Sequence, residues 1–149
     1  MVVTATQTQP DQDQRDNILE RLDHSIEQVV LQRQDPVSGL LPASTAHTVH
    51  GNYGDAWVRD CVYSVQCVWA LALAHRRRRG SHDRRAWELE QRVIALMRGL
   101  LRAMLRQANK VERFKVSLDP LDALHAKYDS SSGDPAVSYT HLRAHETQF

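Results

Sequence analysis

The sequence predicts an all-α fold with three helices, and three apolar patterns support this prediction. Residues 14–33 and 81–108 each carry apolar residues at intervals of three and four, which is typical of helices with one buried face. Between them, residues 61–74 form an apolar run that is broken only by Ser64 and Gln66. The chain has 149 residues, of which 42% are hydrophobic and 25% are charged, and these values are typical of one globular domain.

The first predicted helix spans residues 14–33. Its apolar stripe comprises Ile18, Leu19, Leu22, Ile26, Val29 and Val30. Pro36 ends this helix, because a residue that precedes proline is disfavoured in the α region. Residues 1–13 are rich in Thr, Gln and Asp, so we expect them to be disordered.

Residues 40–53 are predicted to form a loop because they show no apolar periodicity. The loop is long for a simple connection, and long loops in compact domains often carry function. It contains His47 and His50, but no cysteine or further histidine lies nearby to complete a metal site. We therefore predict no metal and interpret the two histidines as polar loop residues.

A dense cluster of charged and aromatic residues lies directly before the apolar run, and it comprises Asp55, Trp57, Arg59 and Asp60. An isolated buried ion is costly, so these groups should be paired or face a cleft. Charged groups can hydrogen-bond sugar hydroxyls while an indole ring stacks on the apolar face of the sugar, so the cluster favours a sugar site. The alternative is an ordinary helix start, in which Asp55 or Asp60 is the N-cap.

The second predicted helix runs from about Asp55 to Arg77 and is apolar on nearly every face over residues 61–74, so we expect it to be buried on all sides. Cys61 and Cys67 are the only cysteines, and their spacing points them in different directions on a helix. We therefore predict that both are buried free thiols in a reducing compartment. The apolar run is shorter than the ~18 residues of a membrane span, and the start of the chain lacks the pattern of a secretion signal. We expect a cytoplasmic protein.

A third helix follows Gly80, is capped by Ser81 or Asp83 and extends to about Ala108. Its apolar stripe comprises Leu89, Val93, Leu96, Met97, Leu100, Met104 and Leu105, and four arginines lie off the stripe, namely Arg92, Arg98, Arg102 and Arg106. A basic helix can bind nucleic acid or an acidic partner. No aromatic residues interleave with the arginines, and the net charge of the chain is only +1. We interpret the arginines as a solvated face and do not expect nucleic acid as a partner.

Four separated motifs resemble the N-terminal part of the glycoside hydrolase family 15-like domain. They are residues 40–44 (Leu-Leu-Pro-Ala-Ser), 55–60 (Asp-Ala-Trp-Val-Arg-Asp), 90–101 and 124–128 (Leu-His-Ala-Lys-Tyr), in the order and spacing of that family. The resemblance covers about residues 15–135. The variant that the motifs resemble most occurs in the α and β regulatory subunits of phosphorylase kinase and in their single-domain prokaryotic relatives.

This resemblance implies an (α/α)6 toroid, in which six helical hairpins surround a funnel. Residues 14–136 would be the N-terminal part of this domain and would supply its first three helices. The first and third helices, which are amphipathic, would be outer helices around the apolar second helix as an inner one. Three helices cannot close such a toroid, so we expect one side of the second helix to stay exposed and the chain alone to be marginally stable or insoluble.

The resemblance also implies a set of substrate-binding residues. In glucoamylases of this family a Trp-x-Arg-Asp motif lies in the sugar-binding funnel. Carried over, Arg59 and Asp60 would hold the terminal sugar and Trp57 would form a wall of the pocket. Lys127 is similar to a lysine that lies near the sugar in those enzymes.

Three functions remain open at this point. The resemblance implies first a parent protein that is an inverting glucosidase, which acts on terminal glucosidic bonds of α-glucans in carbohydrate metabolism without metal or organic cofactor. The second is a non-catalytic, phosphorylase-kinase-like regulatory or glucan-sensing domain with a protein partner. The third is a small helical adaptor that uses its Arg-rich helix.

Two features of the chain depart from the pattern of the family. Inverting hydrolysis needs a general acid and a general base, and both glutamates of the family lie downstream of this chain, so we expect the chain itself to contain no catalytic residue. Residues 137–149 look like a translated sequencing adaptor and are predicted to be a non-native tail. For this reason we do not interpret His141, His145 and Glu146 as a metal site.

Overall fold

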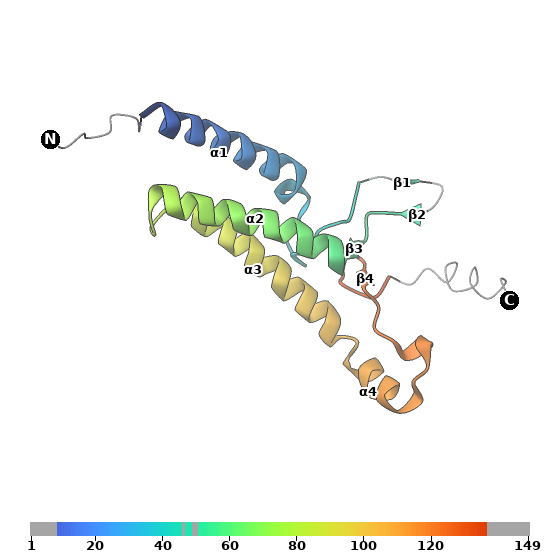
Figure 1. Cartoon of the computed structure of the whole chain (residues 1–149). Coiled ribbons are helices and arrows are strands. Elements are labelled where there is room, and N and C mark those ends of the chain that lie inside the picture. Colours follow the sequence, from blue (N-terminus) through green and yellow to red (C-terminus); the bar gives the residue numbers. More distant parts are fainter. Residues whose placement is uncertain (1–8, 46, 49–50, 137–149) are drawn as a thin grey trace. The chain divides into compact units, whose positions relative to one another are not determined.

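The computed structural model describes residues 9–45, 47–48 and 51–136 (Figure 1). Most of these residues lie in four α-helices, and the strands are two residues long, so the predicted all-α class is confirmed. The chain divides into two compact units. The first comprises the described residues of Met1–Arg33 and Tyr63–Ile94, and the second those of Gln34–Val62 and Ala95–Phe149. The predicted tail, 137–149, lies outside the described residues.

Helix α1 (Gln9–Val29) is followed by a short 3-10 helix, η1 (Leu31–Arg33). It begins earlier than predicted, so the expectation of a disordered segment over 1–13 is wrong for residues 9–13, and residues 1–8 lie outside the described part of the chain. Pro10 is compatible with the helix, because in the first turn its missing N–H would have had no helical acceptor. The apolar stripe is only partly buried: Leu19 is buried, whereas Ile18 and Leu22 are exposed.

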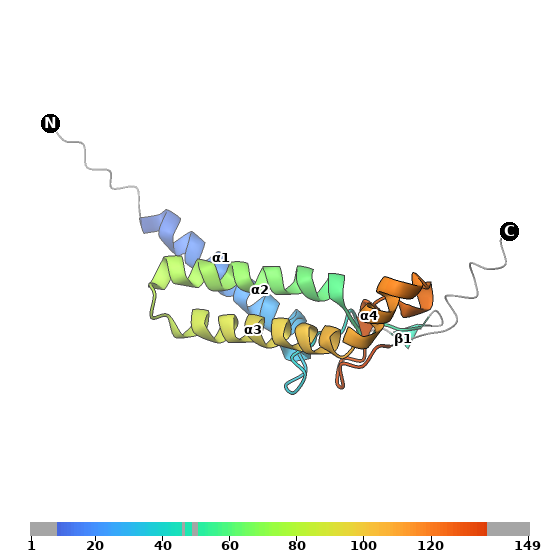
Figure 2. The same cartoon turned by 90° about the horizontal axis from the view of Figure 1, so that it is seen from below.

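Helices α2 (Val58–Arg79) and α3 (Arg84–Leu105) are joined by a short connection and run antiparallel, side by side (Figures 1 and 2). Gly80 ends α2 with a φ of 92°, a conformation that glycine adopts without strain. Asp83 accepts a hydrogen bond of 2.7 Å from the backbone N–H of Ala86 at the start of α3. The prediction that Ser81 or Asp83 caps this helix is thereby confirmed for Asp83.

The core of the first unit is apolar and is bordered by charged groups. Its buried apolar residues are Leu19, Leu31, Val65, Val68, Leu71, Ala72, Ala86, Leu89 and Val93. At its border, Arg85 of α3 donates to Asp23 and Glu27 of α1 at 2.5 and 2.8 Å, and Arg78 of α2 pairs with Asp16. Ion pairs therefore join α1 to both helices of the hairpin.

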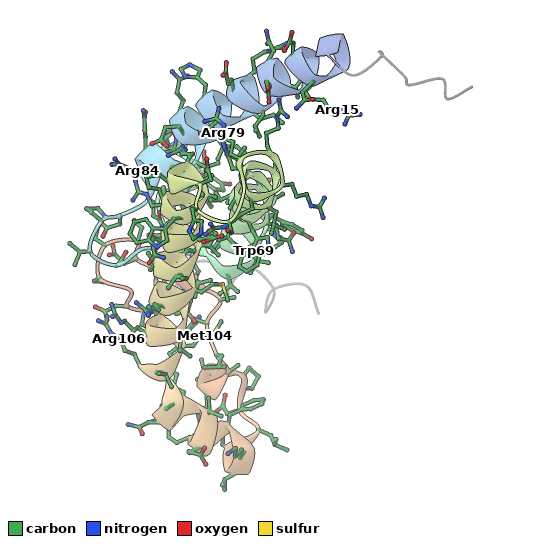
Figure 3. All side chains as sticks on the ribbon, turned by 90° about the vertical axis from the view of Figure 1, so that its left-hand side faces the viewer. Arg15, Trp69, Arg79, Arg84, Met104 and Arg106 are labelled. Carbon is green, nitrogen blue, oxygen red and sulfur yellow. The ribbon has the colours of Figure 1, made fainter. Side chains whose placement is uncertain are left out.

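The expectation that the second helix is buried on all sides is wrong, whereas the expectation that one side of it stays exposed is confirmed. Tyr63 and Trp69, the latter labelled in Figure 3, are 65% and 52% exposed, and Leu73 is exposed as well. Cys61 is buried as predicted, but Cys67 is exposed. An apolar composition indicates only that a helix can be covered on every face, and α1 and α3 leave one face of α2 to solvent.

A fourth helix, α4 (Ala108–Ser117), was not predicted as a separate element. Turn residues at 106–107 end α3 before the predicted boundary near Ala108. No residue of α4 is buried, and its only apolar residues larger than alanine are Val111, Phe114 and Val116, which are few for a stripe of its own. A left-handed residue, Leu118 with a φ of 52°, ends it, and a 3-10 helix, η2 (Pro120–Asp122), follows.

The second unit holds the turn at 35–39 tightly against α3. A Cβ on Gly99 would overlap the backbone carbonyl of Ser38, and a Cβ on Gly39 would overlap that of Ala95. Asp35 organises the turn by accepting hydrogen bonds from the N–H groups of Val37 and Ser38 at 2.9 and 2.7 Å. The buried apolar residues of the second unit are Leu40, Leu41, Ala56, Cys61, Leu96, Leu100, Ala103 and Tyr128.

The predicted loop over 40–53 contains two short strands, β1 (His47–Thr48) and β2 (Gly51–Asn52), which pair antiparallel. Within the same loop, Ala43 N donates to the carbonyl of Asp55 at 2.9 Å, so the segment after Leu41 lies beside the start of the predicted sugar-binding motif. His50 lies outside the described residues, and so does the side chain of His47.

Candidate functional site

Two motifs that are far apart in the sequence meet in a two-stranded sheet of the second unit. Strand β3 (Ala56–Trp57) pairs antiparallel with β4 (Lys127–Tyr128), so that Trp57 is opposite Lys127. The pairing continues into α2, because the N–H of Val58 donates to the carbonyl of Ala126 at 2.9 Å. The predicted second helix therefore begins after Trp57, since residues 56 and 57 are held in extended conformation by their partners.

Lys127 lies between a carboxylate and an aromatic ring. Its Nζ is 2.6 Å from Oδ2 of Asp55 and 5.9 Å from the centre of the Trp57 ring. The side chains of Lys127 and Asp55 are only 21% and 15% exposed, so the ion pair is largely withdrawn from solvent. An ammonium within about 6 Å of an indole ring gains a cation–π attraction. The structure thus brings together two of the four predicted binding residues and adds Asp55 to them.

Arg59 and Asp60 form a pair of their own in the first turn of α2. Nη2 of Arg59 lies 3.3 Å from Oδ2 of Asp60, and their side chains are 71% and 34% exposed. Among the described residues, no hydrogen bond or ion pair links this pair to Lys127. The alternative of Asp55 or Asp60 as N-cap is wrong, because Asp60 lies inside the first turn and Asp55 precedes β3. Asp60 there is favoured by the helix dipole.

A buried amide holds the segment that carries Lys127. Gln107 is 2% exposed, and its Nε2 donates to the carbonyl of His125 at 3.2 Å and to Oη of Tyr128 at 3.0 Å. Its Oε1 accepts from the N–H of His125 at 3.0 Å. Burial raises the pKa of Tyr128, whose side chain is almost fully enclosed. Sequence reasoning missed Gln107, because a lone glutamine carries no motif and its partners lie in a distant segment.

A buried thiol lies close to the start of α2. Sγ of Cys61 donates a hydrogen bond to the carbonyl of Leu41 at 3.3 Å. Burial raises the pKa of this thiol, and the negative charge of Asp60 adds to the effect, although the hydrogen bond to Leu41 acts in the opposite direction. The thiolate is the nucleophilic form of cysteine. Cys61 is therefore a buried packing residue beside the site, and its raised pKa disfavours the thiolate.

The arrangement suits a neutral, hydroxylated ligand with an apolar face. Trp57 supplies a ring, Arg59 supplies exposed donors, and Asp60 supplies a carboxylate that can accept from hydroxyls. The site carries two cations and two carboxylates, so the four charged groups have no net charge, and they form two ion pairs.

The described residues include no group of three His, Cys, Asp or Glu side chains that could hold a metal ion.

Two other features of the described residues include none of the four predicted binding residues. A groove of about 500 Å³ in the first unit contains none of the four predicted binding residues, and its lining consists of Gln12, Arg15, Ile18, Leu19, Leu22, Ala74, Arg77 and Arg78. In the second unit, Arg106, labelled in Figure 3, pairs with Asp134 at 2.8 Å and with the carbonyl of Ser132. One of the arginines of the predicted basic helix is thus engaged within the chain.

Comparison with known proteins identifies one matching family and a set of similar regulatory subunits. The family model of the glycosyl hydrolases family 15 matches residues 18–141 and so runs past the predicted domain boundary at 136. The phosphorylase b kinase regulatory subunit alpha, skeletal muscle isoform, of Oryctolagus cuniculus is 50% identical over 109 residues, which are 72% of this chain and 8% of that protein.

Two relatives from Drosophila melanogaster extend the comparison. The probable phosphorylase b kinase regulatory subunit alpha is 43% identical over 128 residues, 83% of this chain and 10% of that protein. The probable regulatory subunit beta is 35% identical over 122 residues, 79% of this chain and 10% of that protein. The chain thus spans 8–10% of the length of these three relatives. In the part of the chain that the structure describes, every helix is too short or too polar to cross a membrane.

Proposed function

Because the chain belongs to the glycosyl hydrolases family 15, we propose that it is part of a non-catalytic regulatory domain that recognises the terminal sugar of an α-glucan. The observation that carries the proposal is the meeting of Trp57 and Lys127 across β3 and β4, beside the exposed donors of Arg59. The names of the relatives, which are regulatory subunits of a kinase, favour regulation over catalysis.

In this proposal the sugar stacks on Trp57, and the charged groups bind its hydroxyls. Hydrogen bonds to charged groups are shorter and stronger than those between neutral groups. Arg59 is the most available donor, because its side chain is 71% exposed. Asp60 offers acceptors in the same turn, so neighbouring hydroxyls of one sugar could be bound by one residue each.

The proposal assigns the site binding and not proton transfer. Inverting hydrolysis requires one carboxyl group as acid and a second as base on opposite faces of the sugar. Asp55 is paired with Lys127 and Asp60 with Arg59, so the proposal assigns neither carboxylate to these two roles.

The regulatory hypothesis further includes a protein partner, as the names of the relatives imply, and a cytoplasmic location, which the free thiols of Cys61 and Cys67 favour.

Titration of the full chain with maltoheptaose tests the proposal. Binding should change the intrinsic tryptophan fluorescence in a saturable manner, and Trp57→Phe should remove most of that change. The control is Trp87→Phe, which alters an exposed indole on α3 and should leave the change in place. A full chain that shows no saturable response to maltoheptaose contradicts the proposal.

A glucosidase is the second candidate, because the matching family model is that of a hydrolase family. Because the chain itself is expected to contain no catalytic residue, this test needs the longer parent protein, which should be incubated with maltoheptaose while glucose release is followed with an anomer-specific assay. Release of β-glucose by the parent would favour the glucosidase. Binding by the parent without release supports the regulatory domain.

A further inference from the structure

We propose that Asp55 is a specificity-determining residue, which holds Lys127 and thereby restricts the site to neutral sugars and excludes sugars that carry a phosphate or carboxylate. This inference rests on the proposed function, because it concerns the ligands of the same site. The observation behind it is the ion pair of 2.6 Å between Lys127 Nζ and Asp55 Oδ2.

An unpaired lysine at this position would favour anions. Its ammonium lies over the Trp57 ring and is only partly exposed, so a ligand beside that ring would meet a positive charge in a region of reduced screening. Lysine is a common binding group for phosphate. The Asp55 carboxylate forms an ion pair with this ammonium and would itself repel an anionic ligand.

The ion pair is fixed by the backbone on both sides. Asp55 precedes β3 directly, and its carbonyl accepts from the N–H of Ala43 at 2.9 Å. Lys127 is held opposite Trp57 by the register of β3 and β4, and its own carbonyl accepts from the N–H of Ala136 at 3.0 Å. The backbones that carry the carboxylate and the ammonium are therefore held by hydrogen bonds on both sides, that of Asp55 by Ala43 and that of Lys127 by Ala136 and the pairing of β3 with β4.

The second ion pair of the site, Arg59 with Asp60, does not neutralise Lys127 in place of Asp55. Asp60 is engaged by Arg59 and, among the described residues, makes no ion pair with Lys127. With both pairs intact the four groups are neutral together, and Asp55→Asn would leave them with a net positive charge beside the ring. An anionic sugar would then gain an attraction that it lacks in the native chain.

The test uses three probes on the full chain: maltoheptaose and glucose 6-phosphate for the variants, and glucose as the uncharged reference for glucose 6-phosphate. Asp55→Asn should shift the ratio of the two affinities about tenfold towards glucose 6-phosphate and away from maltoheptaose, the factor that corresponds to roughly 1.4 kcal/mol. Adding Lys127→Gln to this variant should abolish the gain. Asp55→Glu retains the charge and should still exclude the phosphate. Asp134→Asn removes one partner of the exposed Arg106 pair and serves as the control that should not alter selectivity.

Three outcomes would overturn the inference. Asp55→Asn could weaken both probes by the same factor, which indicates a purely structural role. The gain in glucose 6-phosphate binding could persist when Lys127 is also replaced, which would show that the phosphate binds away from Lys127. The native chain could bind glucose 6-phosphate more tightly than glucose, a measurement that needs no variant and decides the matter even if Asp55→Asn does not fold. Failure of the proposed function is separate: the native chain would not bind maltoheptaose, while Asp55→Asn would still gain phosphate binding through Lys127.

Discussion

Nε2 of His75 lies 2.9 Å from Oδ2 of Asp23, a residue 52 positions earlier in the chain. The same carboxylate accepts hydrogen bonds from Arg85, and Nδ1 of His75 lies 3.8 Å from Asp83 at the start of α3. Three helices of the first unit thus meet at one carboxylate. Burial acts to raise the pKa of Asp23, but the hydrogen bonds and charges of Arg85 and His75 outweigh it and hold this pKa below the ordinary value.

The first prediction concerns acid stability. Because the pKa of Asp23 is lower in the folded than in the unfolded chain, its contribution is complete above the unfolded value near 4 and is lost as the pH falls through the folded value. Asp23→Asn should reduce the free energy of unfolding at pH 7 by about 1–3 kcal/mol and flatten its decline below about pH 4. Thermal melts followed by circular dichroism between pH 7 and pH 2.5 would measure both effects.

Glu20→Gln is the matched control for this prediction, because Glu20 is an exposed carboxylate on the same helix. It should leave the pH profile unchanged. A difference in stability between the native chain and Asp23→Asn that stays constant from pH 7 to pH 2.5 would show that another group governs the acid transition.

The second prediction concerns the close approach of Gly99 to Ser38. Gly99→Ala places a methyl group against the backbone carbonyl of Ser38, so the turn or α3 must move. Overpacking of this kind costs about 1–3 kcal/mol, which should exceed the gain of roughly 1 kcal/mol from alanine in a helix. Urea denaturation should give a lower midpoint for Gly99→Ala than for the exposed control Gln91→Ala on the same helix. Equal midpoints would mean that the turn adapts without cost.

The third prediction tests the residues carried over from the family. Arg59→Ala and Asp60→Ala should each weaken maltoheptaose binding by about 1.5–3 kcal/mol, the range for a hydrogen bond to a charged group. Calorimetric titration measures the loss. Arg102→Ala removes an exposed arginine of α3 and is expected to leave affinity unchanged. If both replacements at 59 and 60 retain native affinity, the Trp-x-Arg-Asp motif does not bind the sugar.

The fourth prediction concerns Gln107. Replacement by alanine leaves the backbone groups of His125 and the hydroxyl of Tyr128 without their buried partner, which should cost about 1–3 kcal/mol. Hydrogen exchange at the His125 N–H should accelerate in Gln107→Ala and stay slow in Asn109→Ala, an exposed position two residues later. Exchange that is unchanged in both variants would show that β4 is held by other contacts.

The fifth prediction concerns the exposed apolar face of α2. The chain alone should self-associate, because Tyr63, Trp69 and Leu73 leave an apolar surface in contact with water. Replacing Trp69 and Leu73 with glutamine should lower the average mass in sedimentation experiments. Val37→Gln removes an exposed side chain in a turn and should have no such effect. A native chain that sediments as a monomer at high concentration would refute the prediction.

Periodicity predicted the hairpin well because local sequence determines it. Leu89, Val93, Leu96 and Leu100 recur on one face of α3 and are all buried, as expected. The same stripe was predicted to include Met97, Met104 and Leu105, and these three side chains are exposed. Periodicity identifies the face of a helix that can be covered, but the width of the covered strip depends on the neighbouring helices.

The site was predictable only in part. Trp57 and Lys127 were assigned through the family resemblance, and the structure brings them into contact. The partnership of Asp55 with Lys127 was not predicted, because it depends on the register of two strands of two residues each. Strands this short leave no pattern of alternation, and their pairing is decided by contacts between distant segments.

The pairing of Ala56 with Tyr128 has a kinetic consequence. It closes a loop that contains α2, α3 and α4, whereas the α2–α3 hairpin is formed by contacts between neighbouring segments. Local contacts form rapidly, and contacts of large sequence separation must first overcome the entropy of closing the loop. A refolding chain should therefore acquire its helical signal before it can bind a sugar. The interval between the two events would measure how long the chain exists as a folded hairpin without a site.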